Sequence, residues 1–467
     1  MRAFFLLGSL AVGASAGTIS APFIKQRFHD SSSIGKRDTL DLDALNNVTG
    51  GGYYAEFQVG TPGQNISFLL DTGSSDTWVN SDDTDLCSSA SLQSENGYCM
   101  TTFKPDDSRT YKVVDRDGFD ITYLDARQIS GDYFNDTLTI DGKSIQNQQL
   151  GLASKSDRPT GIMGLGFSAN VAANKTYPTV VDNMVSQGLI ERAAFSLWLN
   201  DVDSDQGTIL FGGIDTKKFV GKLATLPLLP EATSLNITSF SVAFEGLKVN
   251  TSDDKEAVDL KDLKSDTVAI LDSGSTLCLL PDDQVEDIYD AFGILSIQGN
   301  NVPFIDCAYG KDKSKGLSFD FQFDGKTISV PMSEMVVDAF SDKQELFDHP
   351  LLKPYFKDWD DVCMFGMAPT SMYGVKTASF VLLGDTFLRS AYVVYDLANE
   401  QLGIAEANPR ANESNIVELK KKDTKLPDVS GVESKNVLED DDNAAGHLSP
   451  ASVVTILMAV GVALTLL

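Results

Sequence analysis

Histidine is scarce in this chain of 467 residues, which contains only His29, His349 and His447. The first and last lie in terminal segments that we expect to be removed. A Ser-His-Asp hydrolase needs a placed histidine, and a histidine-rich zinc site needs several. The remaining one, His349, is followed directly by a proline in a predicted loop. We therefore set both kinds of site aside, and the sequence predicts no metal and no cofactor.

Positive charge is also in short supply, since 37 Lys and Arg residues stand against 66 Asp and Glu residues and give a net charge of −29. Binding of polyanions depends on positive groups, so neither nucleic acid nor an anionic membrane surface is an expected partner. The acidic excess suits a protein that works in acid or acts on basic substrates. Solubility alone explains the acidic excess equally well.

At 42% hydrophobic residues the chain can bury two substantial cores.

Long apolar runs are absent except at the two ends. Residues 3–12 follow Met1-Arg2 and lead into small residues, which is typical of a signal peptide spanning residues 1–16. The run is too short to cross a bilayer. Residues 17–37 carry four basic side chains and end at Lys36-Arg37, which predicts a pro-segment with a processing site. An exposed basic linker is the alternative.

The C-terminal end changes composition after residue 407. Residues 408–443 are rich in Lys, Glu, Asp and Ser and contain no aromatic residue, so we expect a flexible stalk. Asn443 is followed by small residues, a short spacer and an uncharged run over residues 451–467. This order predicts a GPI lipid at Asn443 and removal of residues 444–467, with a retained tail anchor as the alternative.

The rest of the chain is organised around a repeat. Residues 68–75, Phe-Leu-Leu-Asp-Thr-Gly-Ser-Ser, recur as residues 269–276, Ala-Ile-Leu-Asp-Ser-Gly-Ser-Thr. Each copy brings a carboxylate to the end of an apolar strand, where glycine allows a tight turn and hydroxyl groups can bind the carboxylate. Each is followed by a second apolar segment that ends in glycine, at residues 161–166 and 381–384. One such motif is often a simple turn, but two at this separation indicate a duplicated lobe.

Residues 53–406 resemble the pepsin-like aspartic proteases. The resemblance is carried by these motifs, by Trp78 and by the closing run over residues 384–396. The resemblance implies an all-β, bilobal fold with two pseudo-symmetric lobes, residues 38–229 and 230–407, and a cleft between them. Alternating apolar residues in 54–59 independently predict a strand with one buried face. The dibasic site, the acidic composition and the apolar tail make the chain most similar to the yapsins, the cell-surface branch of the fungal enzymes.

The resemblance implies that Asp71 and Asp272 are catalytic. At a separation of about 3 Å, charging both costs roughly 5 kcal/mol at an effective dielectric of about 20, so the pair shares one proton. The ionised aspartate can then activate a water while the other protonates the peptide carbonyl. The residues expected to support the pair are Thr72, Gly73, Ser74, Ser273, Gly274 and Ser275.

Residues 117–140 predict two strands around a polar turn. In the family a tyrosine at the position of Tyr123 lies on a flap that closes over the substrate, and Trp78 binds its hydroxyl. The tip, residues 124–127, departs from the family's glycine-rich turn. In fungal relatives an aspartate at the position of Asp125 overhangs the pocket for the residue before the cut, which implies a preference for Lys or Arg. A solvated turn residue neutralised by Arg127 is the alternative.

Five cysteines suggest two disulfides and one free thiol. Cys278 lies in an apolar run far from any histidine, so we expect a buried thiol and not a nucleophile. The family resemblance pairs Cys87 with Cys99 and Cys307 with Cys363. Seven glycosylation sequons fit passage through the secretory route: Asn47, Asn65, Asn135, Asn174, Asn236, Asn250 and Asn412.

The sequence thus predicts a monomeric, GPI-anchored aspartic endopeptidase at the plasma membrane or cell wall, with proteins and peptides as substrates. Three alternatives stay open. They are a catalytically inactive cell-wall binding protein with the same fold, a broad-specificity acid protease, and a soluble vacuolar protease.

Overall fold

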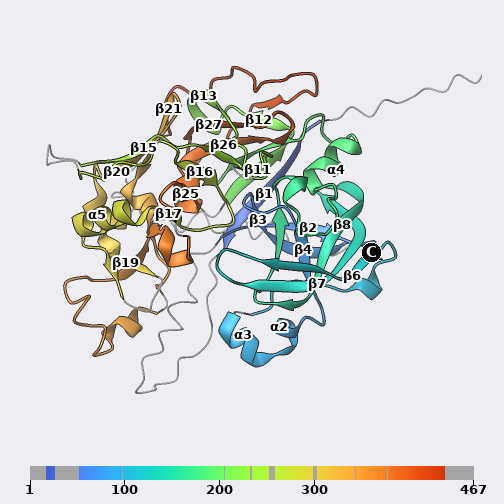
Figure 1. Cartoon of the computed structure of the whole chain (residues 1–467), viewed down its shortest axis with the longest axis horizontal. Helices are drawn as coiled ribbons and strands as arrows, with labels where there is room; N and C mark the ends of the chain where they lie inside the picture. The colour runs from blue at the N-terminus through green and yellow to red at the C-terminus, as the bar shows by residue number, and fades with distance from the viewer. Residues whose placement is uncertain are drawn as a thin grey trace, which may run out of the picture. The chain divides into compact units, whose positions relative to one another are not determined.

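The structure is a computed structural model that describes residues 17–26, 52–96, 98–204, 206–231, 234–251, 258–297, 302–341, 343–375 and 377–436. The predicted signal peptide, Lys36-Arg37, Asn47, Asn443 and residues 444–467 lie outside these ranges. The described chain consists mainly of β-strands (Figure 1), which confirms the predicted fold class. Among the described residues, no helix has the length and apolar character needed to cross a membrane.

The largest sheet holds most of the first lobe. Its main path runs β13-β27-β26-β10-β11-β1-β2-β3-β9-β4-β8-β7-β6. The bounds are β1 (Ile19–Gln26), β2 (Gly52–Val59), β3 (Gln64–Asp71), β4 (Thr77–Ser81), β6 (Lys112–Thr122), β7 (Gln128–Ile140), β8 (Lys143–Ser156), β9 (Gly161–Gly164), β10 (Ala194–Trp198), β11 (Gln206–Phe211), β13 (Phe219–Pro227), β26 (Ala391–Asp396) and β27 (Gln401–Ala407). In β2, Phe57 and Val59 are buried while Glu56 and Gln58 are exposed, as their alternation predicts.

The second lobe contains three smaller sheets, with orders β14-β16-β25-β17-β24, β15-β20-β21 and β18-β19-β23-β22. Their bounds are β14 (Ser241–Ala243), β15 (Gly246–Asn250), β16 (Val268–Leu271), β17 (Cys278–Leu280), β18 (Leu295–Ser296), β19 (Pro303–Asp306), β20 (Ser318–Phe323), β21 (Lys326–Pro331), β22 (Val336–Val337), β23 (Val362–Phe365), β24 (Met367–Pro369) and β25 (Phe380–Leu383). The duplication is visible in the pairing, because β3 lies parallel to β9 as β16 lies parallel to β25.

Helices are short and few in the described chain. Two segments form the helices α4 (Val180–Ser186) and α5 (Asp282–Phe292). In α5 the buried side chains include Val285 and Ile288, and the helix ends at Gly293, whose φ of 67° is left-handed. Both helices cover strands of their own lobe (Figure 1).

The two lobes share the large sheet. Strands β26 and β27 come from the predicted second lobe, yet β26 pairs with β10 and β27 pairs with β13 of the first. A buried ion pair supports this seam, because Arg192 Nε donates to Asp396 Oδ1 at 3.0 Å. The predicted lobe boundary between residues 229 and 230 therefore does not separate the sheet, because strands from both sides of it pair with one another.

The predicted pro-segment contributes a strand to the same sheet. Its residues form β1, which pairs with β11 on one side and with β2 on the other. Ile19, Ala21 and Phe23 alternate along β1 and are buried in the core. Before any processing this segment is therefore part of the folded lobe.

The prediction of a flexible stalk is wrong for residues 408–436. Strand β28 (Ile416–Glu418) pairs with β12 (Gly213–Asp215), and Leu419 and Leu426 are buried. Gln401 Nε2 donates to the carbonyl of Thr424 at 2.9 Å. The average composition of the segment does not reveal this order. Two buried leucines and the backbone hydrogen bonds of one strand edge are enough to hold a polar segment against the fold.

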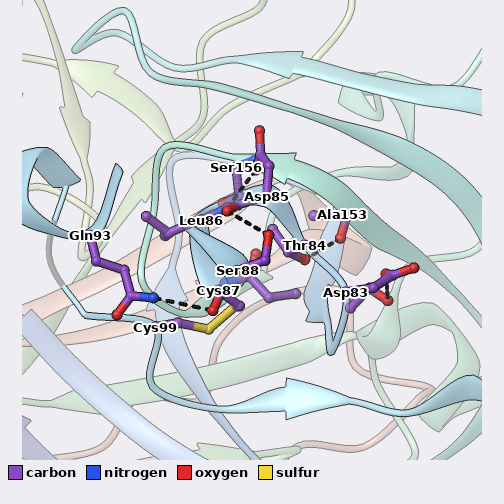
Figure 2. Close-up of a disulfide and its surroundings, with 12 residues drawn as sticks. Asp83, Thr84, Asp85, Leu86, Cys87, Ser88, Gln93, Cys99, Ala153 and Ser156 are labelled. Atoms are coloured by element: carbon purple, nitrogen blue, oxygen red, sulfur yellow. Dashed lines mark hydrogen bonds between the residues drawn. A yellow bond between two sulfur atoms is a disulfide. The ribbon is translucent and has the colours of Figure 1, made fainter. Parts of the chain in front are cut away.

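Both predicted disulfides are present, and the predicted free thiol, Cys278, is buried. Burial raises the pKa of Cys278 to about 11. Cys87 lies in α2 (Asp85–Ser88) and Cys99 follows α3 (Ala90–Asn96). Figure 2 shows how this loop is tied to β8: Thr84 Oγ1 donates to the carbonyl of Ala153 at 2.6 Å.

Candidate active site

The two copies of the repeat form matching turns. Strand β3 ends at Asp71, and β16 ends just before Asp272. The amide of Gly73 donates to Asp71 Oδ1, and that of Gly274 donates to Asp272 Oδ1, each at 2.8 Å. The other carboxylate oxygens accept from hydroxyls, Asp71 Oδ2 from Ser74 and Asp272 Oδ2 from Ser275. Both carboxylates are therefore hydrogen-bonded by the glycine and serine of their own turn.

Hydrogen bonds cross between the two turns. Thr72 Oγ1 donates to the carbonyl of Leu271, and Ser273 Oγ donates to the carbonyl of Leu70, each at 2.8 Å. Each hydroxyl also accepts the backbone amide of the other residue, at 3.0 Å for Thr72 Oγ1 and 3.2 Å for Ser273 Oγ. All four bonds are buried. They hold the ends of β3 and β16 against each other across the lobes.

The glycines of the turns leave room for the opposite carboxyl group. A Cβ on Gly73 would lie 2.6 Å from Asp272 Cγ, and one on Gly274 would lie 2.3 Å from Asp71 Oδ1. Neither distance is compatible with an alanine unless a carboxyl group moves. Glycine is needed because the two aspartates face each other there.

Burial, followed by the negative charge of Asp272, raises the pKa of Asp71 to about 7, and the hydrogen bond from Ser74 opposes part of this rise. In acid one of the two facing carboxyl groups therefore keeps its proton. Such a pair can both accept a proton and donate one, which is the requirement for general acid and base catalysis. Among the described residues, no group of His, Cys, Asp and Glu side chains is suited to hold a metal ion.

The predicted flap is the hairpin of β6 and β7. Trp78 Nε1 donates to the hydroxyl of Tyr123 at 2.8 Å, as the family resemblance implied. The glycine-poor tip closes because Ala126 adopts a left-handed φ of 65° and its amide donates to the carbonyl of Tyr123 at 2.9 Å.

Asp125 at the tip has partners that the sequence revealed only in part. Arg127 Nε lies 3.7 Å from its Oδ2, as the alternative reading anticipated. Arg158 Nη2 is closer, at 2.8 Å, and comes from the segment between β8 and β9. Sequence reasoning missed Arg158, because no local pattern links it to the flap.

Sequence reasoning also missed a buried acid, Asp76, that is hydrogen-bonded to strand β7 of the hairpin. Asp76 Oδ1 accepts from the hydroxyls of Tyr133 at 2.8 Å and Tyr177 at 2.6 Å, and its Oδ2 accepts from the amide of Ala172 at 2.7 Å. Asp76 is only 1% exposed. Its place directly after the first aspartate turn is the one sequence signal that could have revealed it.

Six of the seven predicted glycosylation sites are described. Asn135 is half-buried, and its Nδ2 donates to Asn147 Oδ1 at 3.2 Å. The exposed sites are Asn65, Asn174, Asn236, Asn250 and Asn412.

Residues 52–407 match the family model described as eukaryotic aspartyl protease. The chain belongs to this family. It is 36% identical over 403 residues to the "Probable aspartic-type endopeptidase OPSB" of Arthroderma benhamiae, covering 85% of this chain and 76% of the relative. It is 35% identical to an "Acid protease" of Saccharomycopsis fibuligera, over 76% of this chain and 80% of the relative. "Secreted aspartic protease 4" of Candida albicans is 29% identical over 83% of both chains. This aspartyl protease is therefore an aspartic-type endopeptidase.

Proposed function

We propose that Asp71 and Asp272 are the catalytic pair of this endopeptidase. The observation that carries the proposal is the facing arrangement of the two carboxyl groups, with the pKa of Asp71 raised to about 7. The ionised carboxylate takes a proton from a water, whose oxygen attacks the peptide carbonyl carbon. The protonated carboxyl gives its proton to the carbonyl oxygen, and a neutral tetrahedral diol results. No covalent intermediate and no cofactor are required.

Thr72, Gly73, Ser74 and their counterparts Ser273, Gly274 and Ser275 have positioning roles in this proposal. Their hydrogen bonds satisfy the carboxylate oxygens and hold the two turns together. The geometry of the pair is thus preorganised before substrate arrives, which reduces the barrier to reaction.

The proposed specificity is cleavage after Lys or Arg. It is supported by Asp125, which lies two residues beyond the flap tyrosine and whose side chain is 34% exposed. A fully exposed ion pair with substrate contributes only about 0 to 1 kcal/mol. A charge-assisted hydrogen bond covered by the closed flap contributes about 1.5 to 3 kcal/mol. The preference for basic residues therefore depends on flap closure over the pair.

The proposed location is the extracellular face of the plasma membrane or the cell wall, in the manner of a yapsin. Residues 1–16 have the pattern of a signal peptide, residues 443–467 have the pattern of a GPI signal, and one relative is named as secreted. Five of the sequon asparagines are exposed, which supports glycosylation on the secretory route. Phosphatidylinositol-specific phospholipase C should release the mature monomer from membranes. Recovery of residues 451–467 from that form would contradict GPI processing.

The decisive experiment is a peptide-library digest at acid pH with and without pepstatin. Asp71→Asn and Asp272→Asn should each abolish cleavage while the protein stays folded, because neither variant can form the singly protonated pair. Asp136→Asn is a matched control, since Asp136 is also buried but its carboxylate accepts from Ser108 and Thr110. Residual activity above about 1% of wild type in either dyad variant, which is roughly 2.7 kcal/mol of barrier, would overturn the assignment. An inactive wild type would favour the binding-protein alternative.

A further inference from the structure

The flap tip holds a compact cluster of three charges. Asp125 Oδ2 accepts from Arg158 Nη2 at 2.8 Å and lies 3.7 Å from Arg127 Nε. The side chains of Arg158 and Arg127 are only 17% and 21% exposed. This partial burial distinguishes the cluster from the solvent-exposed ion pairs of the surface, which contribute little.

Arg158 is held in place from outside the hairpin. Its backbone carbonyl accepts from Asn80 Nδ2 at 3.0 Å, and its guanidinium carbon lies 4.8 Å from the centre of the Tyr123 ring. Its Nε is buried and has no hydrogen-bond partner among the described residues. The guanidinium thus lies over the flap tyrosine and has a buried donor, Nε, that is not hydrogen-bonded within the described part of the chain.

The cluster lies beside the flap tyrosine. The hydroxyl of Tyr123 accepts from Trp78 Nε1 at 2.8 Å, and the pKa of Tyr123 is raised by burial and then by the charge of Asp71. The pKa of Tyr373 in the second lobe is raised by burial and further by Asp125, while Arg127 opposes the rise. Tyr373 belongs to the short 3-10 helix at Thr370–Tyr373. The three charges therefore lie beside the flap tyrosine, and Tyr373 of the second lobe is within electrostatic reach of Asp125.

We propose that Arg158 is a specificity-determining residue that competes with basic substrate side chains for Asp125. Its guanidinium already occupies the carboxylate oxygen that a Lys or Arg before the cut would use. A basic side chain must share or displace this contact, whereas an apolar one need not. This inference rests on the proposed function. It implies that the enzyme prefers Lys or Arg less strongly than it would if Arg158 did not bind Asp125.

The test uses peptides that differ only in the residue before the cut, which is Lys, Leu or Glu. Arg158→Gln is expected to raise the ratio of kcat/KM for the Lys peptide to that for the Leu peptide by about tenfold. Arg158→Met removes the same charge but keeps the aliphatic stem against Tyr123. It should show the same rise in the ratio, and it tests the proposal even where Arg158→Gln folds poorly. Arg158→Lys retains a cation and should change the ratio less than either.

A double-mutant cycle isolates the contact with Asp125. In an Asp125→Ala background, Arg158→Gln should raise the Lys to Leu ratio less than it does in wild type, because only the direct repulsion between Arg158 and the substrate lysine is then relieved. In Asp125→Ala alone, the two arginines lose their counterion, so cleavage of the Glu peptide should rise.

Two results would overturn the inference. One is an unchanged Lys to Leu ratio in both Arg158→Gln and Arg158→Met. The other is an equal loss of all three peptides, which would make Arg158 a structural support of Tyr123. Failure of the proposed function is distinguishable, because wild type would then cleave none of the peptides, the Leu peptide included.

Discussion

The two aspartate turns begin alike and then diverge. Thr72 and Ser273 stand 201 residues apart, and the same offset pairs the flanking aspartates, glycines and hydroxyl residues. It then pairs Asp76 with Leu277 and Trp78 with Leu279. After the first turn these positions bind three tyrosines by hydrogen bonds. After the second they are packed with apolar side chains.

This difference has a structural meaning. The shared part of the turns makes a symmetric pair of carboxyl groups, which needs the same residues in both lobes. The divergent part of the first turn binds Tyr123 and Tyr133 of the β6–β7 hairpin. A duplicated sequence therefore retained the residues that face the partner lobe and changed those that face its own lobe's hairpin.

The largest expected effect comes from the shared part. Gly73→Ala and Gly274→Ala should each lower kcat/KM by at least about a hundredfold, because the new methyl group displaces the opposite carboxyl and misplacement of catalytic groups is costly. Peptide hydrolysis measures the effect. Gly246→Ala is the control, since its Cβ would meet only the flexible amide of Gln322, at 3.0 Å. Full activity in one dyad-glycine variant would show that the two turns are not equivalent.

The disulfides also differ between the lobes. Loop-closure entropy predicts about 4 kcal/mol for Cys307–Cys363, whose sequence separation is 56, and about 3 kcal/mol for Cys87–Cys99, whose separation is 12. Each cysteine pair can be replaced by alanine and the free energy of unfolding measured by urea denaturation. Loss of the Cys307–Cys363 pair should lower this free energy more than loss of the Cys87–Cys99 pair. The order would be wrong if loss of the smaller loop were the more damaging, and any disulfide formed by Cys278 in peptide mapping would contradict the pairing.

Protonation of Asp71 makes stability depend on pH. The fold raises its pKa from 3.8 to about 7, so it favours the protonated form. This contribution is complete below about pH 4 and is lost as pH rises through 7, a change of roughly 4 kcal/mol. Asp71→Asn carries no such proton and should lose less stability between pH 4 and pH 8 in denaturation experiments. An equally steep decline in this variant would contradict the assignment. Asp136→Asn should decline like wild type.

Asp76→Leu copies the second lobe's residue into the first. It leaves the buried hydroxyls of Tyr133 and Tyr177 without their acceptor, so we expect the free energy of unfolding to fall by about 2 to 4 kcal/mol. Asp76→Asn retains an acceptor oxygen and should cost less. If Asp76→Leu is as stable as wild type, the hydrogen bonds of Asp76 do not stabilise the first lobe, and the difference between the two turns has no effect on stability.

The smallest expected effect is at Trp78. Trp78→Phe keeps the ring but removes the donor to Tyr123, so kcat/KM should fall about three- to tenfold, or about 0.6 to 1.4 kcal/mol, with little change in Tm. Trp198→Phe is the control, because Trp198 Nε1 donates at 3.2 Å to Asn408, away from the flap. Equal losses in both variants would point to general destabilisation.

The sequence by itself determined the features that depend on neighbouring residues. Alternation of apolar side chains predicted β2, the apolar run before each aspartate predicted a buried strand, and the glycine and hydroxyl residues predicted the turns. The five cysteines indicated two disulfides and a free thiol. These features are local because backbone geometry and side-chain periodicity act over a few residues.

Only the tertiary structure decided which distant side chains meet. Arg158 reaches Asp125 across 33 residues, and Asp76 reaches Tyr133 and Tyr177 across 57 and 101. The packing of residues 408–436 against β12 and β27 was likewise invisible in their polar composition. Such contacts form because packing of the sheets brings specific buried donors and acceptors together, and each buried polar group then requires a partner wherever the fold supplies one.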